Sequence, residues 1–125
     1  MNVIRRVVVF DASDIEAESS FWAGLLGGEV HRDGDWHSVL VDGDWVLGVQ
    51  RAPNHVAPEW PSGPQQQQVH LDLHVDDLGE AARLAGDLGG RQLQGARRPA
   101  DNPDGNEMFE VWASPAGHPL CFGIH

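Results

Sequence analysis

The sequence lacks the features that mark secreted and membrane-spanning proteins. It contains a single cysteine, Cys121, so no disulfide can form within the chain, and this suits a reducing compartment. The apolar run near the N-terminus, residues 7–10, is far shorter than a signal-peptide core or the roughly 20 residues of a membrane span. We therefore expect a cytoplasmic protein.

Positive charge is also scarce. Lysine and arginine together number 8, against 19 aspartates and glutamates, which gives a net charge of −11. Such a charge disfavours binding to nucleic acid or to anionic membrane surfaces, so we expect neither as a partner. The 125 residues, of which 41% are hydrophobic, suffice for one globular domain with a buried core.

The first half of the chain carries a pattern of one strand, one helix and three strands. The expected elements cover residues 3–10, 14–26, 29–32, 36–41 and 45–51. Ser13-Asp14-Ile15-Glu16 has the form of a capping box at the start of the helix, and Gly27-Gly28 supplies its end. Asp-Gly pairs separate the three strands, as expected for tight hairpins.

The second half repeats this pattern after a proline-rich connection. Leu-Gly-Gly at 26–28 recurs at 88–90, and the expected elements cover residues 69–75, 78–88, 91–94, 107–113 and 120–124. We therefore predict an α+β fold in which two βαβββ modules form a curved eight-stranded mixed sheet with the helices outside. A single domain would span residues 1–125, with module 1 at about 1–52, a linker at about 53–68 and module 2 at about 69–125.

The segment 69–75 alternates apolar and polar residues, as half-buried strands do, and places His70, Asp72 and His74 on one face. At about 3.3 Å per residue, the two histidines lie roughly 13 Å apart, too far to bind one small metal ion together. Asp72 can orient either imidazole and raise its pKa. This face can be a polar network, a ligand-contact wall, or a catalytic pair in which His70 is a general base and Asp72 its partner.

Other candidate ligand-binding residues lie on strands that would line the same concave surface. They are Gln50, Cys121, Trp36, Glu110 and Trp112. The amide of Gln50 can donate and accept hydrogen bonds, and indoles suit flat aromatic ligands. The alternatives are that Cys121 is a small buried hydrophobe and that the indoles pack in the core or at an interface.

Four segments in this order resemble the vicinal oxygen chelate superfamily, which includes glyoxalase I, bleomycin-resistance proteins and extradiol dioxygenases. The segments are Phe21-Trp22-Ala23-Gly24-Leu25-Leu26-Gly27, Leu47-Gly48-Val49-Gln50-Arg51, Val69 to Asp77, and Ala113-Ser114-Pro115-Ala116-Gly117-His118-Pro119-Leu120-Cys121. The similarity is greatest to the glyoxalase-like subgroup with an HLDL…DD segment. It implies two paired βαβββ modules, in line with the pattern above.

The resemblance also implies a metal site that draws ligands from the first and last strands of each module. Carried onto this chain, those positions fall near Val7 or Val8, at Gly48, at His70 and at Cys121. Only His70 is an ordinary ligand there, whereas a catalytic site needs three or four. We therefore expect a degenerate site with no metal and no other cofactor.

Three classes of function remain open. The chain can be a small-molecule binder that sequesters its ligand, as resistance-type relatives do. It can be an enzyme of lyase, isomerase or dioxygenase type, working either without metal through His70 and Asp72 or with an atypical metal site. It can also be a structural or regulatory domain with a vestigial pocket. We favour the binder, with a small molecule as the partner and a homodimer as the assembly implied by the resemblance.

Overall fold

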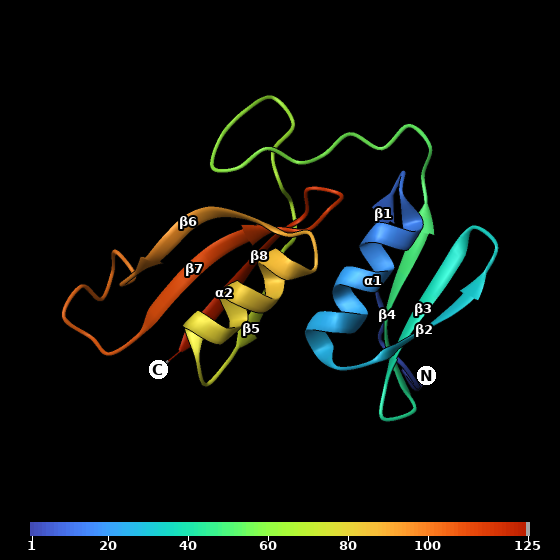
Figure 1. Ribbon diagram of the computed structural model, residues 1–125, viewed down its shortest axis with the longest axis horizontal. Helices are drawn as coiled ribbons and strands as arrows, with labels where there is room; N and C mark the ends of the chain where they lie inside the picture. The colour runs from blue at the N-terminus through green and yellow to red at the C-terminus, as the bar shows by residue number, and fades with distance from the viewer. Residues whose placement is uncertain (125) are drawn as a thin grey trace. The chain divides into compact units, whose positions relative to one another are not determined.

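The computed structural model describes residues 1–124. They fall into two compact units, one over residues 1–55 and one from residue 56 onward. Each unit contains a strand, a helix and three strands in that order (Figure 1). The predicted α+β class and the two βαβββ modules are confirmed, and the eight strands form two four-stranded sheets. Within residues 1–124, no helix combines the length and apolarity that crossing a membrane requires.

The first unit contains one helix on one mixed sheet. Its elements are β1 (Val8–Ala12), α1 (Ile15–Leu26), β2 (Glu29–Asp33), β3 (Trp36–Val41) and β4 (Asp44–Arg51). The strands lie in the order β1-β4-β3-β2, with β1 parallel to β4 and the other pairs antiparallel. The first strand therefore pairs with the last, and the middle strands are the hairpins that the Asp-Gly turns predict.

Helix α1 begins one residue later than the capping box predicts. The side chain of Asp14, not Ser13, accepts a hydrogen bond from the backbone N–H of Ala17 at 3.0 Å. The expected capping role of Glu16 is also wrong, because its carboxylate accepts a hydrogen bond from Arg32 Nε at 2.8 Å. Gly27 ends the helix at φ 70°, a conformation that glycine adopts without steric penalty.

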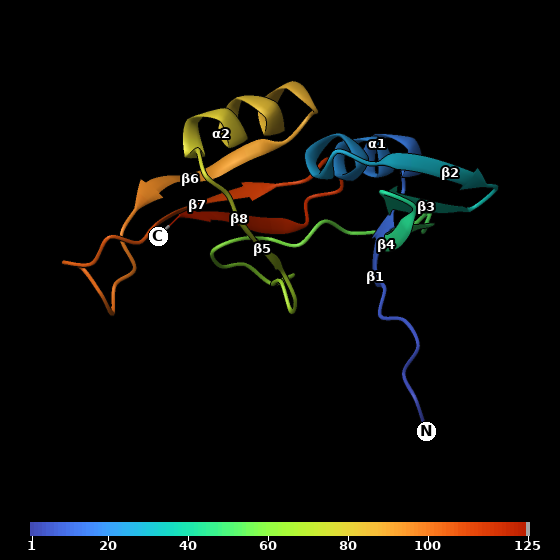
Figure 2. The same cartoon turned by 90° about the horizontal axis from the view of Figure 1, so that it is seen from below.

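The core of the first unit lies between α1 and the sheet. Phe21 and Trp22 of the helix are fully buried, and the Trp22 indole stacks on Phe10 of β1 with ring centroids 4.8 Å apart. The predicted buried strand over 3–10 is wrong in both extent and burial. The observed strand begins at Val8, and in it Phe10 is buried whereas Val8 and Val9 are exposed. Val9 points away from Phe10, to the face of this sheet that the helix does not cover (Figure 2).

The second unit repeats the topology of the first. Its elements are β5 (Leu71–His74), α2 (Leu78–Asp87), β6 (Arg91–Arg97), β7 (Met108–Ala113) and β8 (Pro119–Ile124). The strands lie in the order β5-β8-β7-β6, with β5 parallel to β8. The expected strand over 69–75 is thus shorter than predicted, and His70 lies just before its first residue.

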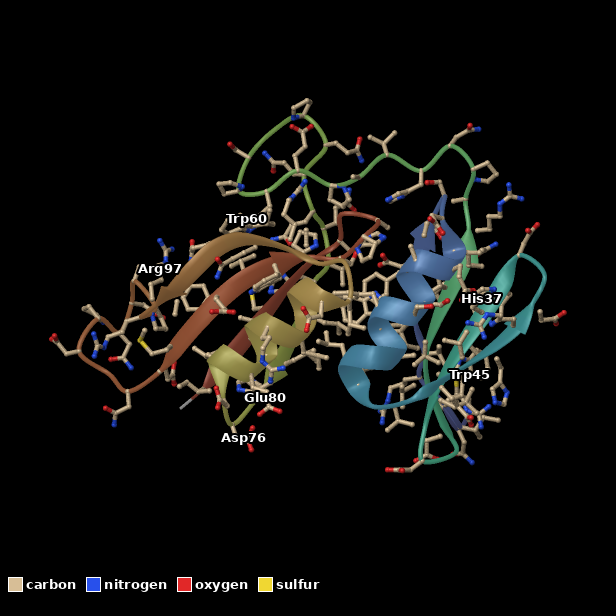
Figure 3. All side chains as sticks on the ribbon, in the orientation of Figure 1. His37, Trp45, Trp60, Asp76, Glu80 and Arg97 are labelled. Atoms are coloured by element: carbon tan, nitrogen blue, oxygen red, sulfur yellow. The ribbon has the colours of Figure 1, made fainter. Side chains whose placement is uncertain are left out.

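Helix α2 covers one face of this second sheet (Figure 2). The side chain of Asp77 accepts from the backbone N–H of Glu80 at 3.0 Å, and Asp76 and Glu80 lie at this end of the helix (Figure 3). Negative charge at this end of the helix interacts favourably with the positive end of the helix dipole. The buried helix residues Ala81 and Ala85 are small, which lets the helix pack closely against β6, β7 and β8.

Candidate functional site

The parallel pairing of β5 with β8 brings together residues that lie far apart in the sequence. Asp72 is paired with Cys121, and His74 with Gly123. Because side chains alternate along a strand, these residues share one face, while Leu120 and Phe122 point to the other. Leu120 and Phe122 are buried, and Phe122 packs against Trp112, so this second face is the one that α2 covers.

A cavity of about 310 Å³ opens on the face that carries Asp72 and Cys121. Its polar wall consists of His70, Asp72, His74 and Glu107. The remaining lining residues are Pro99, Met108, Phe109, Cys121, Gly123 and Ile124. All of them belong to the second unit, so the site is contained in one βαβββ module.

Three of the lining side chains form a tight group. His70 Nε2 lies 3.2 Å from Asp72 Oδ1, and both side chains are partly exposed. Ligand atoms of His70, Asp72 and Cys121 all lie within 4.8 Å of one another. Burial, followed by the charge of Asp72 and a hydrogen bond to it, raises the pKa of the Cys121 thiol to about 11. The thiol is therefore protonated at neutral pH and is not an activated nucleophile.

Four of the residues proposed from the sequence, His70, Asp72, His74 and Cys121, line this one cavity. Glu110 and Trp112 do not, and their expected place on the pocket wall is wrong. Register explains this, because Glu110 pairs with Phe122 and Trp112 with Leu120, all on the face that α2 covers. Both residues are buried, and Trp112 Nε1 donates a hydrogen bond to Glu110 Oε1 at 2.7 Å.

Trp36 and Gln50 belong to the first unit, where they are paired across β3 and β4. The Trp36 indole lies over Gly48, because a Cβ added at Gly48 would stand 2.5 Å from Trp36 Cζ2. Trp36 Nε1 donates to Ser38 Oγ at 2.9 Å, and its ring meets Trp45 edge to face with centroids 6.1 Å apart. Neither Trp36 nor Gln50 lines the cavity of the second unit.

Several cavity residues were not predicted from the sequence. The two-residue periodicity of the strands could have identified Phe109. It is paired with Gly123, which is itself paired with His74 on the cavity face. Pro99 and Glu107 lie in the connection between β6 and β7, where no periodicity operates, and Met108 and Ile124 come from strand ends. Only the folded connection brings these side chains to the site.

The metal set implied by the resemblance does not fit this chain. In the first unit Val9 is paired with Gly48, as Asp72 is paired with Cys121 in the second. The implied positions Val7 or Val8 and Gly48 have no side chain that binds a metal, and an indole lies over Gly48. In the second unit, however, Asp72 joins His70 and the thiol of Cys121 in one group.

The two βαβββ units, one of them with a cavity on its sheet, define a protein of the vicinal oxygen chelate type. The chain matches the family described as glyoxalase-like domain over residues 7–123, and it belongs to that family. No curated protein matches the sequence.

Solved structures of similar fold agree with this assignment. The fosfomycin resistance protein FosX from Listeria monocytogenes has a TM-score of 0.71 at 11% identity, over 100% of this chain and 95% of that one. A glyoxalase-related enzyme from Fulvimarina pelagi has a TM-score of 0.69 at 20% identity, over 98% and 89%. A glyoxalase/bleomycin resistance protein/dioxygenase family enzyme from Burkholderia phytofirmans PsJN has a TM-score of 0.71 at 14% identity, over 94% and 95%. At these identities the likeness establishes the fold alone.

Proposed function

We propose that the second unit binds a small organic molecule in its cavity and holds it without converting it. One observation carries this proposal: His70, Asp72, His74 and Cys121, from two distant segments, line one cavity of about 310 Å³. That volume lies at the lower end of the range of ligand pockets, which are about 300–1,000 Å³. A cytoplasmic location and a homodimer accompany the proposal as predictions.

The lining favours a neutral or cationic ligand with an apolar part. Asp72 and Glu107 bring two carboxylates to the wall, and the whole chain carries a net charge of −11. The lining also includes Met108, Phe109 and Ile124, against which an aromatic or aliphatic group can pack. An anionic ligand would meet like charge at the polar wall and would be disfavoured.

The second candidate function is catalysis, and the contact between His70 and Asp72 favours it. A carboxylate 3.2 Å from the imidazole Nε2 can hold that ring in one orientation, as a general base requires. The protonated thiol of Cys121 argues against nucleophilic catalysis at this wall. Sequestration therefore remains our first choice.

A thermal-shift screen of the metal-free protein, prepared with a chelator, tests the proposal. Aromatic compounds carrying a positive, neutral or negative group are compared at equal concentration. We expect hits among the first two sets, since a ligand at 100 times its Kd stabilises the folded chain by about 2.7 kcal/mol. Phe109→Ala should remove the shift, whereas His31→Ala, on the exposed β2 strand of the first unit, should leave it unchanged.

The fate of the hit then separates the functions. Mass spectrometry after incubation should recover the compound unchanged, and its conversion would establish the enzyme instead. A shift that survives Phe109→Ala would place binding elsewhere on the chain. The absence of hits across all three sets would favour the structural or regulatory class.

A further inference from the structure

We propose that His70, Asp72 and Cys121 form a three-ligand site for a thiophilic divalent cation such as Zn²⁺, with its fourth position open to the cavity. The site lies entirely within the second unit. It goes beyond small-molecule binding, because a cation held there would provide a Lewis-acidic anchor for whatever enters the cavity.

The spacing of the three donors carries the proposal. The imidazole, carboxylate and thiol atoms already lie within 4.8 Å of one another, and His70 Nε2 is 3.2 Å from Asp72 Oδ1. Zinc binds such ligands at about 2.0–2.3 Å, which places neighbouring ligand atoms roughly 3.5 Å apart. Small side-chain rotations, for which the partial exposure of His70 and Asp72 leaves room, together with release of the Cys121 thiol proton to solvent as the cation binds, therefore complete the site.

The backbone fixes two of the ligands in a rigid frame. Asp72 and Cys121 are directly paired across the parallel strands β5 and β8, so their side chains leave the sheet side by side. His70 lies two residues before Asp72 and therefore projects from the same face. Ligands on strands are held more exactly than ligands on loops, which lowers the cost of assembling a coordination sphere.

The mixture of donors selects the class of cation. One nitrogen, one carboxylate oxygen and one sulfur suit Zn²⁺ and other thiophilic ions, whereas Mg²⁺ and Ca²⁺ take oxygen ligands only. Three protein ligands and one open position are the arrangement of catalytic rather than structural zinc sites. Here the cavity, with His74 and Glu107 on its wall, leaves space for a water molecule or a ligand atom at that position.

This site shares His70 and Cys121 with the one implied by the resemblance, but its third ligand is different. The other two implied ligands would come from the first unit, where Val7 or Val8 and Gly48 supply none. Asp72 is the additional donor, and it occupies no position in the implied set. The second unit thus gathers three ligands without the first.

Metal titration of the full-length, reduced chain tests the inference directly. Co²⁺ is added as a spectroscopic probe, since a bound thiolate produces a charge-transfer band in the near ultraviolet, and Zn²⁺ is then added as a competitor. We expect one Co²⁺ per chain, displaced by Zn²⁺, with elemental analysis after dialysis giving one Zn²⁺ per chain. The variants are Cys121→Ser, Asp72→Asn and His70→Ala, with His74→Ala as a control on the same wall and His31→Ala as a surface control.

Each ligand variant should weaken Zn²⁺ binding by about 100-fold or more, since loss of an outer-sphere partner alone costs about 10–100-fold. Cys121→Ser should also abolish the charge-transfer band, while both controls keep the band and the affinity. Circular dichroism checks that each variant is folded. If His70→Ala does not fold, the conservative variants Cys121→Ser and Asp72→Asn still test the site.

Three results would overturn the inference. They are no stoichiometric binding, Zn²⁺ affinity unchanged in Cys121→Ser, and equal loss of affinity in His74→Ala. The outcome is separable from that of the proposed function, because the ligand screen uses metal-free protein. Ligand hits without metal binding would reject the cation site alone, and metal binding without ligand hits would reject the proposed function alone.

Discussion

At the scale of single residues, Glu16 shows how an exposed carboxylate can be strongly perturbed. It lies in the first turn of α1 and accepts hydrogen bonds from Arg32 of β2. The bond to Arg32 is the main reason why the pKa of Glu16 falls from 4.5 to about 2. Because the folded pKa is depressed, its contribution to stability is complete above pH 4.5 and is lost as the pH falls towards 2.

We predict that Glu16→Gln lowers the free energy of unfolding at pH 7 by less than about 1 kcal/mol, because both partners are about half exposed and solvent screens the pair. The difference between variant and parent should shrink as the pH is lowered from 4.5 towards 2. Urea unfolding at a series of pH values measures this. Glu29→Gln, at another exposed carboxylate, serves as the control, and a difference that grows at low pH would contradict the argument.

Residue type and spacing located part of the site. The alternation through 69–75 marked His70, Asp72 and His74, and the structure places all three on one cavity wall. The same reasoning misplaced Glu110 and Trp112. Their polar groups suggested a pocket wall, but the register of β7 against β8 puts both side chains on the face beneath α2. A buried Glu–Trp hydrogen bond satisfies both polar groups there, so a carboxylate on the covered face costs less than its charge suggests.

At the scale of elements, the close contact between β3 and β4 depends on a glycine. A Cβ at Gly48 would stand 2.5 Å from the Trp36 indole, closer than any real contact allows. The indole cannot move freely, since it donates to Ser38 and packs against Trp45. Gly48 therefore lets a tryptophan lie flat on the strand pair.

We predict that Gly48→Ala destabilises the chain by about 1–3 kcal/mol, the usual cost of overpacking. Gly95→Ala is the matched control within β6, because nothing lies within 4 Å of a Cβ added there. That control should be neutral or slightly stabilising, since alanine restricts the unfolded chain more than glycine does. Thermal unfolding followed by tryptophan fluorescence measures both, and equal effects at the two positions would refute the role assigned to Trp36.

At the scale of the whole molecule, the net negative charge affects the stability of the fold. The chain carries −11, and few cations offset this, so repulsion among carboxylates opposes the folded state at neutral pH. Salt screens such repulsion over a distance of about 8–10 Å at physiological ionic strength.

We predict that added NaCl raises the thermal midpoint at pH 7.5 by a few degrees, which corresponds to about 1 kcal/mol. Near the calculated pI of 4.7 the net charge vanishes, and the same salt addition should have little effect. Differential scanning calorimetry at both pH values measures this. A midpoint that falls with salt at pH 7.5 would mean that attractive ion pairs, such as Arg32–Glu16, outweigh the repulsion.

The class and the order of the elements can be predicted from local patterns in the amino-acid sequence. Hydrophobic periodicity and glycine or aspartate at helix ends are local signals, so β3 and the ends of α1 and α2 were predictable to within one or two residues. The duplicated pattern and the glyoxalase-like segments likewise determined the two βαβββ modules.

Which side chains meet depends on strand register and on the paths of the connections, and these are seen only in the folded chain. The register of β5 against β8 sets Asp72 beside Cys121, and no local signal in either strand encodes that pairing. The connection between β6 and β7 supplies Pro99 and Glu107 to the cavity through its folded path, which periodicity does not describe. Contacts between residues far apart in the sequence depend on long-range pairing, and for that reason the group of His70, Asp72 and Cys121 emerged only from the fold.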